Sequence, residues 1–334
     1  MYSDLPLWLS LLYIVGGLVA LTWSSGIFVD GSAALARRWG VSPFVIGMVI
    51  IGFGTSAPEL CVSALSGIAG HADLSLGNAY GSDNFNIAVI LGVAALIRPL
   101  VVKPTLVKFG APLLTLVSIL PMALIWDGHL SRLDAIVHLA VFAIVLPLYC
   151  WIDRAPTLEN AEEAPTPKQH ALLVDLLMVV GGLAVLIGSS HFLVWGAVDL
   201  ARVCGVSELL IGLTIVAIGT SLPELASAIQ SARRGQDEFV LGNIVGSNFF
   251  NTLAVVGLSC TINPPAKFSP YILTRDLPLM IALSASIALF GYNRRNPSAN
   301  GTVTRKEALL WILVYIVYTG VMLVQESRPG VSAP

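Results

Sequence analysis

The chain has 334 residues, of which 56% are apolar and 11% charged, and its mean hydropathy is +0.82. Soluble globular proteins carry about 25% charged residues, so this composition excludes an ordinary soluble enzyme and a disordered chain. The net charge of −2 offers no basic surface to a nucleic acid. The four cysteines lie singly in apolar runs without CxxC spacing, which argues against a disulfide framework or a zinc site. The remaining class is an all-α integral membrane protein.

Ten apolar runs along the chain are long enough to cross a bilayer. A hydrocarbon core about 30 Å thick needs roughly 20 helical residues. The first run is predicted to be a retained span and not a signal peptide, because Asp4 is the only charge before it. The ten predicted spans are 6–29, 43–69, 77–97, 109–126, 133–152, 171–195, 206–232, 240–262, 272–292 and 306–324.

The basic residues sort unequally between the two sides that ten spans define. Five of the 18 lie on the side that follows even-numbered spans, namely Arg132, Arg202, Lys267, Arg275 and Arg328. The other 13 follow odd-numbered spans, namely Arg37, Arg38, Arg98, Lys103, Lys108, Arg154, Lys168, Arg233, Arg234, Arg294, Arg295, Arg305 and Lys306. Because basic loops stay in the cytoplasm, both termini are predicted to lie outside.

One long polar segment, Asp153 to His170, separates the fifth span from the sixth. It is rich in Pro and Glu and has no apolar face, so we expect a cytoplasmic linker. A plain tether and a regulatory segment fit this composition equally well.

The sequence contains an internal repeat, in which IGFGTSAPEL at 51–60 matches VAIGTSLPEL at 216–225. The same spacing, called the repeat offset below, also aligns Val15-Gly16-Gly17-Leu18 with Val180-Gly181-Gly182-Leu183. Each half holds five spans, an odd number, so the second half enters the membrane from the opposite side. We therefore predict two inverted five-helix repeats, 1–152 and 171–334, joined by the linker 153–170. Duplication without functional symmetry is the less favoured alternative.

Two carboxylates, Glu59 and Glu224, occupy equivalent positions inside apolar spans. An ionised group there is costly, and no Lys or Arg lies within either repeat core. The compensating positive charge must therefore be a bound cation or protons. The alternative is a pair of permanently protonated glutamates.

The residues around the two acids are rich in oxygen. Thr55 and Thr220 lie four residues before the glutamates, which would place them on the same face of a continuous helix. Prolines one residue before each glutamate break the helix and release carbonyls. An all-oxygen ligand set suits Ca²⁺ or Na⁺ and argues against Zn²⁺ or Cu⁺. Further hydroxyls and amides come from Ser56, Ser221, Asn78, Ser82, Asn86, Asn243, Ser247 and Asn251, although small polar residues also join membrane helices.

Asp83 has no acidic counterpart, because the second repeat has Asn248 at that position. It could lie beside an ion path or bond to a neighbouring backbone. The second interpretation is preferred.

These motifs resemble the cation/calcium exchanger superfamily and its sodium/calcium exchangers. The resemblance rests on GTSAPEL with GNAYGSDNFN and on GTSLPEL with GNIVGSNFFN. It implies that Glu59 and Glu224 ligate Ca²⁺ with help from Thr55 and Thr220. It further implies Na⁺ contacts from Ser56, Ser82, Ser221 and Ser247 and from the carbonyls of Gly52 and Ala217, with Asn86 and Asn251 completing the central layer.

The chain departs from the family pattern at Asn251, where many members carry Asp, and at Asp83. The central site would then hold two acids, which leaves the counter-ion open. We expect a Ca²⁺/Na⁺ antiporter of a bacterial inner membrane, with H⁺ as the alternative counter-ion. A channel is disfavoured because an inverted repeat occludes its site. No His accompanies Ser56 or Ser221, so an intramembrane enzyme is disfavoured too. Neither a cofactor nor an obligate protein partner is expected.

Overall fold

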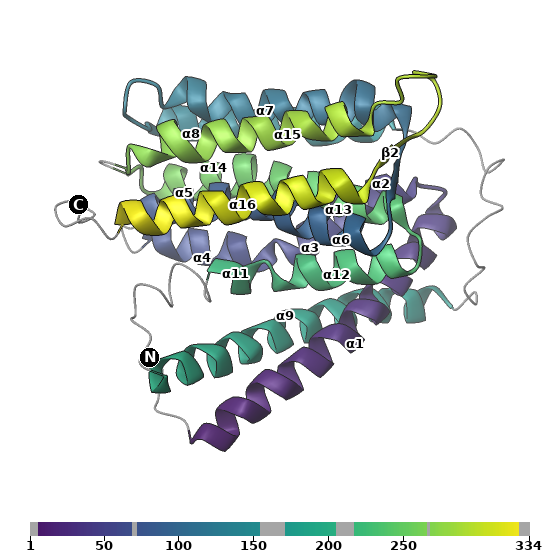
Figure 1. Cartoon of the computed structure of the whole chain (residues 1–334), viewed down its shortest axis with the longest axis horizontal. Helices are drawn as coiled ribbons and strands as arrows, with labels where there is room; N and C mark the ends of the chain where they lie inside the picture. The colour runs from purple at the N-terminus through teal and green to yellow at the C-terminus, as the bar shows by residue number, and fades with distance from the viewer. Residues whose placement is uncertain (1–5, 69–71, 154–170, 205–216, 266–267, 327–334) are drawn as a thin grey trace. The chain divides into compact units, whose positions relative to one another are not determined.

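The computed structural model describes residues 6–68, 72–153, 171–204, 217–265 and 268–326, and these parts are almost entirely helical (Figure 1). They form two compact units. The first unit comprises residues 1–58 and 154–243, and the second comprises residues 59–153 and 244–334. Each unit thus combines segments from both predicted halves of the sequence.

The elements of the first half include three π-helical turns. In order they are α1 Leu7–Trp39, α2 Pro43–Ile46, η1 Gly47–Gly52, α3 Phe53–Thr55, α4 Ala57–Ile68, α5 Ala72–Phe85, η2 Asn86–Leu91, α6 Gly92–Ile97, β1 Leu100–Val102, η3 Leu106–Gly110, α7 Ala111–Leu124 and α8 Arg132–Ile152.

The described part of the second half has a related order of helices, but its strand comes just before the last helix. Its elements are α9 Leu172–Val203, α11 Ala217–Thr220, α12 Leu222–Arg233, α13 Asp237–Phe249, η5 Phe250–Val255, α14 Val256–Ile262, η6 Ile272–Asp276, α15 Leu277–Gly291, β2 Gly301–Val303 and α16 Arg305–Glu326. The helices α4 and α12 are separated by the repeat offset at both their first and their last residues, so the offset in sequence is also an offset of secondary structure.

Within the described residues, eight helices are long and apolar enough to cross a membrane, or nine when the bent pair Pro43–Thr55 and Ala57–Ala64 counts as one span. The chain is therefore a multi-pass helical membrane protein. The first helix continues past its predicted end at residue 29 to Trp39, and Gly40 ends it in the left-handed conformation at φ 61°. Residues 206–216 of the predicted seventh span and residues 154–170 of the predicted linker lie outside the described residues.

The long helices α1 and α9 pack side by side in the first unit (Figure 1). A Cβ atom on Gly17 would lie 2.9 Å from Cβ of Leu193, and one on Gly182 would lie 2.9 Å from the backbone nitrogen of Phe28. Residue numbers thus rise along α1 as they fall along α9, so the helices are antiparallel. Leu193 and Phe28 are themselves separated by the repeat offset, which makes the two contacts reciprocal, as a two-fold axis requires.

Polar contacts tie the helices of the first unit together near their ends. The buried carboxylate of Asp175 on α9 pairs with Arg38 on α1 at 2.9 Å. At the other end Ser10 donates a hydrogen bond to Asp199, which is buried. Arg234, just after α12, reaches Asp30 at 2.9 Å and the carbonyl of Gly26 at 2.9 Å. These contacts fix α1, α9 and α12 as one packed group.

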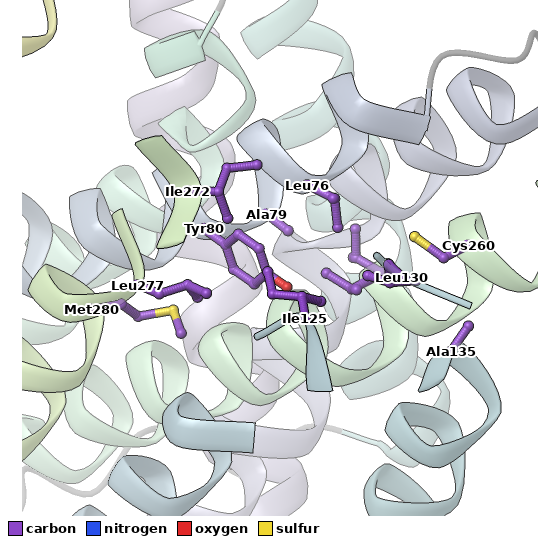
Figure 2. Close-up of a cluster of buried hydrophobic side chains, with 12 residues drawn as sticks. Leu76, Ala79, Tyr80, Ile125, Leu130, Ala135, Cys260, Ile272, Leu277 and Met280 are labelled. Carbon is purple, nitrogen blue, oxygen red and sulfur yellow. The ribbon is translucent and has the colours of Figure 1, made fainter. Parts of the chain in front are cut away.

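The core of the second unit gathers side chains from both halves of the sequence (Figure 2). Tyr80 of α5, which is fully buried, lies among Ile125, Leu277 and Met280. Since lipid tails are as apolar as leucine, such a core is held by close packing and not by a preference over lipid.

Glycines at equivalent positions also allow close approach of helices in the second unit. A Cβ on Gly92 of α6 would lie 3.0 Å from Ile312 of α16, and one on Gly257 of α14 would lie 2.8 Å from Leu139 of α8. Gly92 and Gly257 are equivalent positions under the repeat offset. Each half therefore supplies the glycine that packs on a helix of the other half. The short strands β1 and β2 pair antiparallel and join the halves a second time.

Candidate functional site

Both GTSxPEL motifs break their helix at the serine. Ser56, at φ −82° and ψ 4°, separates α3 from α4. Ser221, at φ −91° and ψ 8°, separates α11 from α12. The first break bends the helix pair by 43°. The predicted interruption of the spans is thus confirmed in both copies.

The breaks place each glutamate in the first turn of a new helix. Glu59 is the third residue of α4 and Glu224 the third of α12, and both are buried. The partial positive charge of a helix N-terminus favours a carboxylate at this position. The placement of Thr55 and Thr220 on the glutamates' helix face rests on a continuous helix, which the serine interrupts, so it stays a prediction.

The first unit joins the two motifs directly. The Ser56 hydroxyl donates to Oε1 of Glu224 at 3.1 Å, so a residue of the first motif contacts the acid of the second. Thr55 Oγ1 bonds to the Ile51 carbonyl at 2.9 Å and lies 3.3 Å from Oδ1 of Asn243. The Asn243 amide in turn donates to the backbone carbonyl of Glu224 at 3.4 Å.

The second carboxylate oxygen of Glu224 differs from the first in its surroundings. Glu224 Oε2 is buried and makes no hydrogen bond with any residue that the structure describes. The three described arginine–aspartate pairs use Asp175, Asp30 and Asp276, which lie outside the motifs. A buried carboxylate with an open oxygen suits a bound cation, which would repay its desolvation.

The backbone carbonyls around the breaks have different partners. The Gly52 carbonyl, a predicted Na⁺ contact, accepts the backbone N–H of Ser56 at 3.0 Å. The Gly219 carbonyl, which Pro223 cannot bond, accepts the hydroxyl of Ser190 at 3.0 Å. The other predicted contacts of this unit, Ala217 and Thr220, begin and end α11.

The second unit holds the remaining predicted ligands, which are Glu59, Ser82, Asn86, Ser247 and Asn251, and all five are buried. Asn86 is the first residue of η2 and Asn251 the second of η5. Wide π-helical turns occur frequently at functional sites. Asn86 Nδ2 donates to Asn248 Oδ1 at 3.0 Å, and Asn248 Nδ2 donates to the Asp83 carbonyl at 3.3 Å.

The preferred interpretation of Asp83, a bond from its carboxylate to a neighbouring backbone, was wrong about the partner. The carboxylate accepts the hydroxyl of Thr252 at 2.6 Å, and both residues are buried. In the other repeat the same two positions hold Asn248 and Ile87. These two of the differences between the repeats therefore form one interacting pair.

Asn243, which the sequence already placed in the oxygen-rich set, contacts the motifs, whereas Asn248 and Thr252 were not singled out as ligands from the sequence. Several carboxylate and amide oxygens remain without a hydrogen bond after these contacts are made. Glu224 Oε2, Asn86 Oδ1 and Asn251 Oδ1 are buried and make no hydrogen bond with described residues. Carboxylate and amide oxygens are the ligands of hard cations such as Ca²⁺.

The sequence profile of the family described as "Sodium/calcium exchanger protein" matches residues 9–151 and 174–324, and the starts of the two matches are separated by the repeat offset. The chain is 39% identical over 319 residues to "Putative antiporter CaxA" of Alkalimonas amylolytica, covering 92% of this chain and 96% of that protein. It is 36% identical to "Inner membrane protein YrbG" of Escherichia coli K12, covering 85% and 89%.

A solved structure gives the same result for the fold. The sodium–calcium exchanger NCX_Mj, soaked with 2.5 mM Na⁺ and 10 mM Sr²⁺, matches with a TM-score of 0.79 and 30% identity. The match covers 93% of this chain and 98% of the other. The chain belongs to the sodium/calcium exchanger family of membrane cation antiporters and is a transporter, not an enzyme.

Proposed function

We propose that the chain exchanges Ca²⁺ for Na⁺ across the membrane by alternating access. The observation that carries this proposal is the buried Glu224 carboxylate, held by Ser56 through one oxygen and open at the other. An equivalent acid, Glu59, stands at the same place after the other helix break. Two such charges balance one Ca²⁺ or two Na⁺.

The proposed ligands are the oxygens of both motifs and of the segments that follow them. Glu59 and Glu224 bind Ca²⁺ with Thr55 and Thr220. Na⁺ binds Ser56, Ser82, Ser221, Ser247 and the carbonyls of Gly52 and Ala217, and Asn86 and Asn251 complete the site. Neither a cofactor nor an obligate protein partner is needed for this cycle.

Exchange follows from sharing these ligands. Two unit charges about 4 Å apart repel by about 4 kcal/mol at an effective dielectric of 20. Na⁺ ions and Ca²⁺ on the same carboxylates therefore exclude each other. The neutralised site crosses between its two access states, whereas the empty site carries uncompensated negative charge and does not.

Alternating access in this proposal uses ten spans arranged as two inverted five-helix repeats, 1–152 and 171–334, around the linker 153–170. The antiparallel packing of α1 on α9 and the reciprocal glycine contacts support it. The two family matches, which are separated by the repeat offset, support it as well.

Transport of ⁴⁵Ca²⁺ into proteoliposomes tests the proposal. Uptake should require an outward Na⁺ gradient and should be lost in Glu224→Gln, which keeps the acceptor for Ser56 but loses the charge. Uptake driven by a H⁺ gradient alone would assign H⁺ as the counter-ion. Unchanged uptake by Glu224→Gln would refute the site.

We further propose an inner-membrane location with both termini outside and the linker in the cytoplasm, based on the unequal distribution of basic residues. A cysteine introduced at Ser332 should react with an impermeant thiol reagent in intact cells, and one at Thr166 should not. A background without the native cysteines is the control. The reverse labelling pattern would refute the orientation.

A further inference from the structure

The amide of Asn86 is held by a short chain of hydrogen bonds in the second unit. Its nitrogen donates to Asn248 Oδ1 at 3.0 Å, and the Asn248 nitrogen donates to the Asp83 carbonyl at 3.3 Å. Asn86 and Asp83 are 0% exposed, and Asn248 is 1% exposed. These hydrogen bonds are therefore shielded from water, which could otherwise replace one of the three residues.

The donor and acceptor roles in these hydrogen bonds are set at one end by the Asp83 carbonyl, which cannot donate. A backbone carbonyl only accepts, and its second lone pair remains available inside a helix. The Asn248 atom that faces Asp83 must therefore be the nitrogen, which turns the Asn248 oxygen toward Asn86. The Asn86 atom facing that oxygen must be its nitrogen, so Oδ1 of Asn86 points elsewhere. That oxygen makes no hydrogen bond with any described residue.

The other repeat lacks this arrangement. The residue equivalent to Asn248 is Asp83, whose carboxylate is occupied by the Thr252 hydroxyl at 2.6 Å. Asn251, equivalent to Asn86, lies near that carboxylate. Neither of its amide atoms makes a hydrogen bond with a described residue. The residue that faces Asn86 is thus an amide, whereas the residue near Asn251 is a carboxylate.

We propose that Asn248 is a positioning residue, which fixes the Asn86 amide with its oxygen directed to the transported cation. This inference rests on the proposed function, in which Asn86 is a ligand. An amide that could rotate would present its N–H₂ group to the cation in half of its orientations, and that group repels positive charge. Asn248 removes that orientation before the ion arrives.

A double-mutant cycle tests the proposal. The reconstituted full-length protein is assayed for the Ca²⁺ concentration that gives half-maximal ⁴⁵Ca²⁺ uptake. Asn248→Leu should raise this concentration about fivefold, the typical effect of losing a hydrogen bond between neutral groups. Asn86→Asp places an oxygen at both terminal positions, so orientation ceases to matter. In that background Asn248→Leu should not raise the half-saturation concentration, because the Asn248 oxygen there faces a carboxylate oxygen and makes no hydrogen bond with it.

A matched control separates positioning from general packing. Asn84 lies on the helix that precedes Asn86, is also fully buried and donates to the Asp276 carbonyl at 3.2 Å. Asn84→Leu should lower the melting temperature without raising the half-saturation concentration. An equal rise for Asn248→Leu in both Asn86 backgrounds would show a structural role and overturn the proposal.

The proposed ligand role of Asn86 and the positioning role of Asn248 are tested by different variants. If Asn86→Leu impairs Ca²⁺ uptake but Asn248→Leu does not, the positioning role is refuted and the proposed site stands. If Asn86→Leu leaves Ca²⁺ uptake unchanged, Asn86 is not a ligand and the proposed ligand set is refuted together with this inference.

Discussion

The equivalent segments 77–86 and 242–251 share six of their ten residues but differ in their contacts. Asn243 contacts Thr55 and the Glu224 carbonyl in the first unit. Asn78, its equivalent, has an amide nitrogen that is buried without a hydrogen bond to any described residue. Farther along, Asn86 is oriented by Asn248, whereas the amide of Asn251 makes no hydrogen bond with a described residue. A duplicated sequence therefore supplies the same ligand types twice, and a few substitutions give each copy its own geometry.

The largest effect is expected from replacing the two glutamates, which tests whether each copy contributes one charge to the site. Glu59→Gln and Glu224→Gln should each lower Ca²⁺ uptake by more than about 100-fold, because each removes one of two charges that balance the ion. The measurement is ⁴⁵Ca²⁺ uptake, with size-exclusion chromatography to show folded protein. Loss in one variant but not in the other would break the equivalence of the copies.

A second comparison uses the paired glycines of α1 and α9. Gly17→Val and Gly182→Val should each destabilise the protein by about 1–3 kcal/mol, because a Cβ at either position meets the facing helix at 2.9 Å. The neighbouring Gly16 and Gly181 have no atom within 4 Å of a built Cβ and provide matched controls. Melting temperatures in detergent measure the effect. Equal losses at Gly16 and Gly17 would contradict the reciprocal contact.

A smaller effect is expected where one copy supports the acid of the other. Ser56→Ala removes the hydroxyl that lies 3.1 Å from Glu224 Oε1 and should raise the half-saturation concentration for Ca²⁺ about tenfold. Ser32→Ala removes a buried hydroxyl that bonds to the Phe28 carbonyl on the same helix, and should leave Ca²⁺ affinity unchanged. Equal effects of the two changes would show that the Ser56 contact is not specific to the acid.

The smallest effect is expected at Asn251 and tests whether this residue faces the ion, as Asn86 is proposed to do. Asn251→Asp adds a third acidic group to the proposed site, so protons should compete with Ca²⁺ as the pH falls. The half-saturation concentration should then rise about two- to fivefold between pH 8 and pH 6 relative to the parent. Parallel pH profiles for parent and variant would show that Asn251 does not face the ion.

Much of the fold and of the candidate site could be predicted from local sequence. The apolar runs identified the membrane helices because a span needs a minimum length, and the prolines after Ser56 and Ser221 predicted the breaks because proline cannot bond the preceding turn. The face shared by Thr55 and Glu59 stays a prediction, since helical periodicity does not carry across the break at Ser56. The first span was predicted too short because its polar end is buried against α9, which hydropathy cannot detect.

The sequence by itself determined that this is a membrane transporter with two related halves, because the repeat offset carries two acids into apolar spans. It also determined the type of ligand, since only oxygen donors recur in both motifs. Only the tertiary structure decided the partners: Ser56 with Glu224, Asp83 with Thr252, and Asn248 with Asn86. The two members of each pair come from different halves of the chain. The orientation of a side chain depends on what the folded chain brings next to it, and periodicity along one helix does not contain that information.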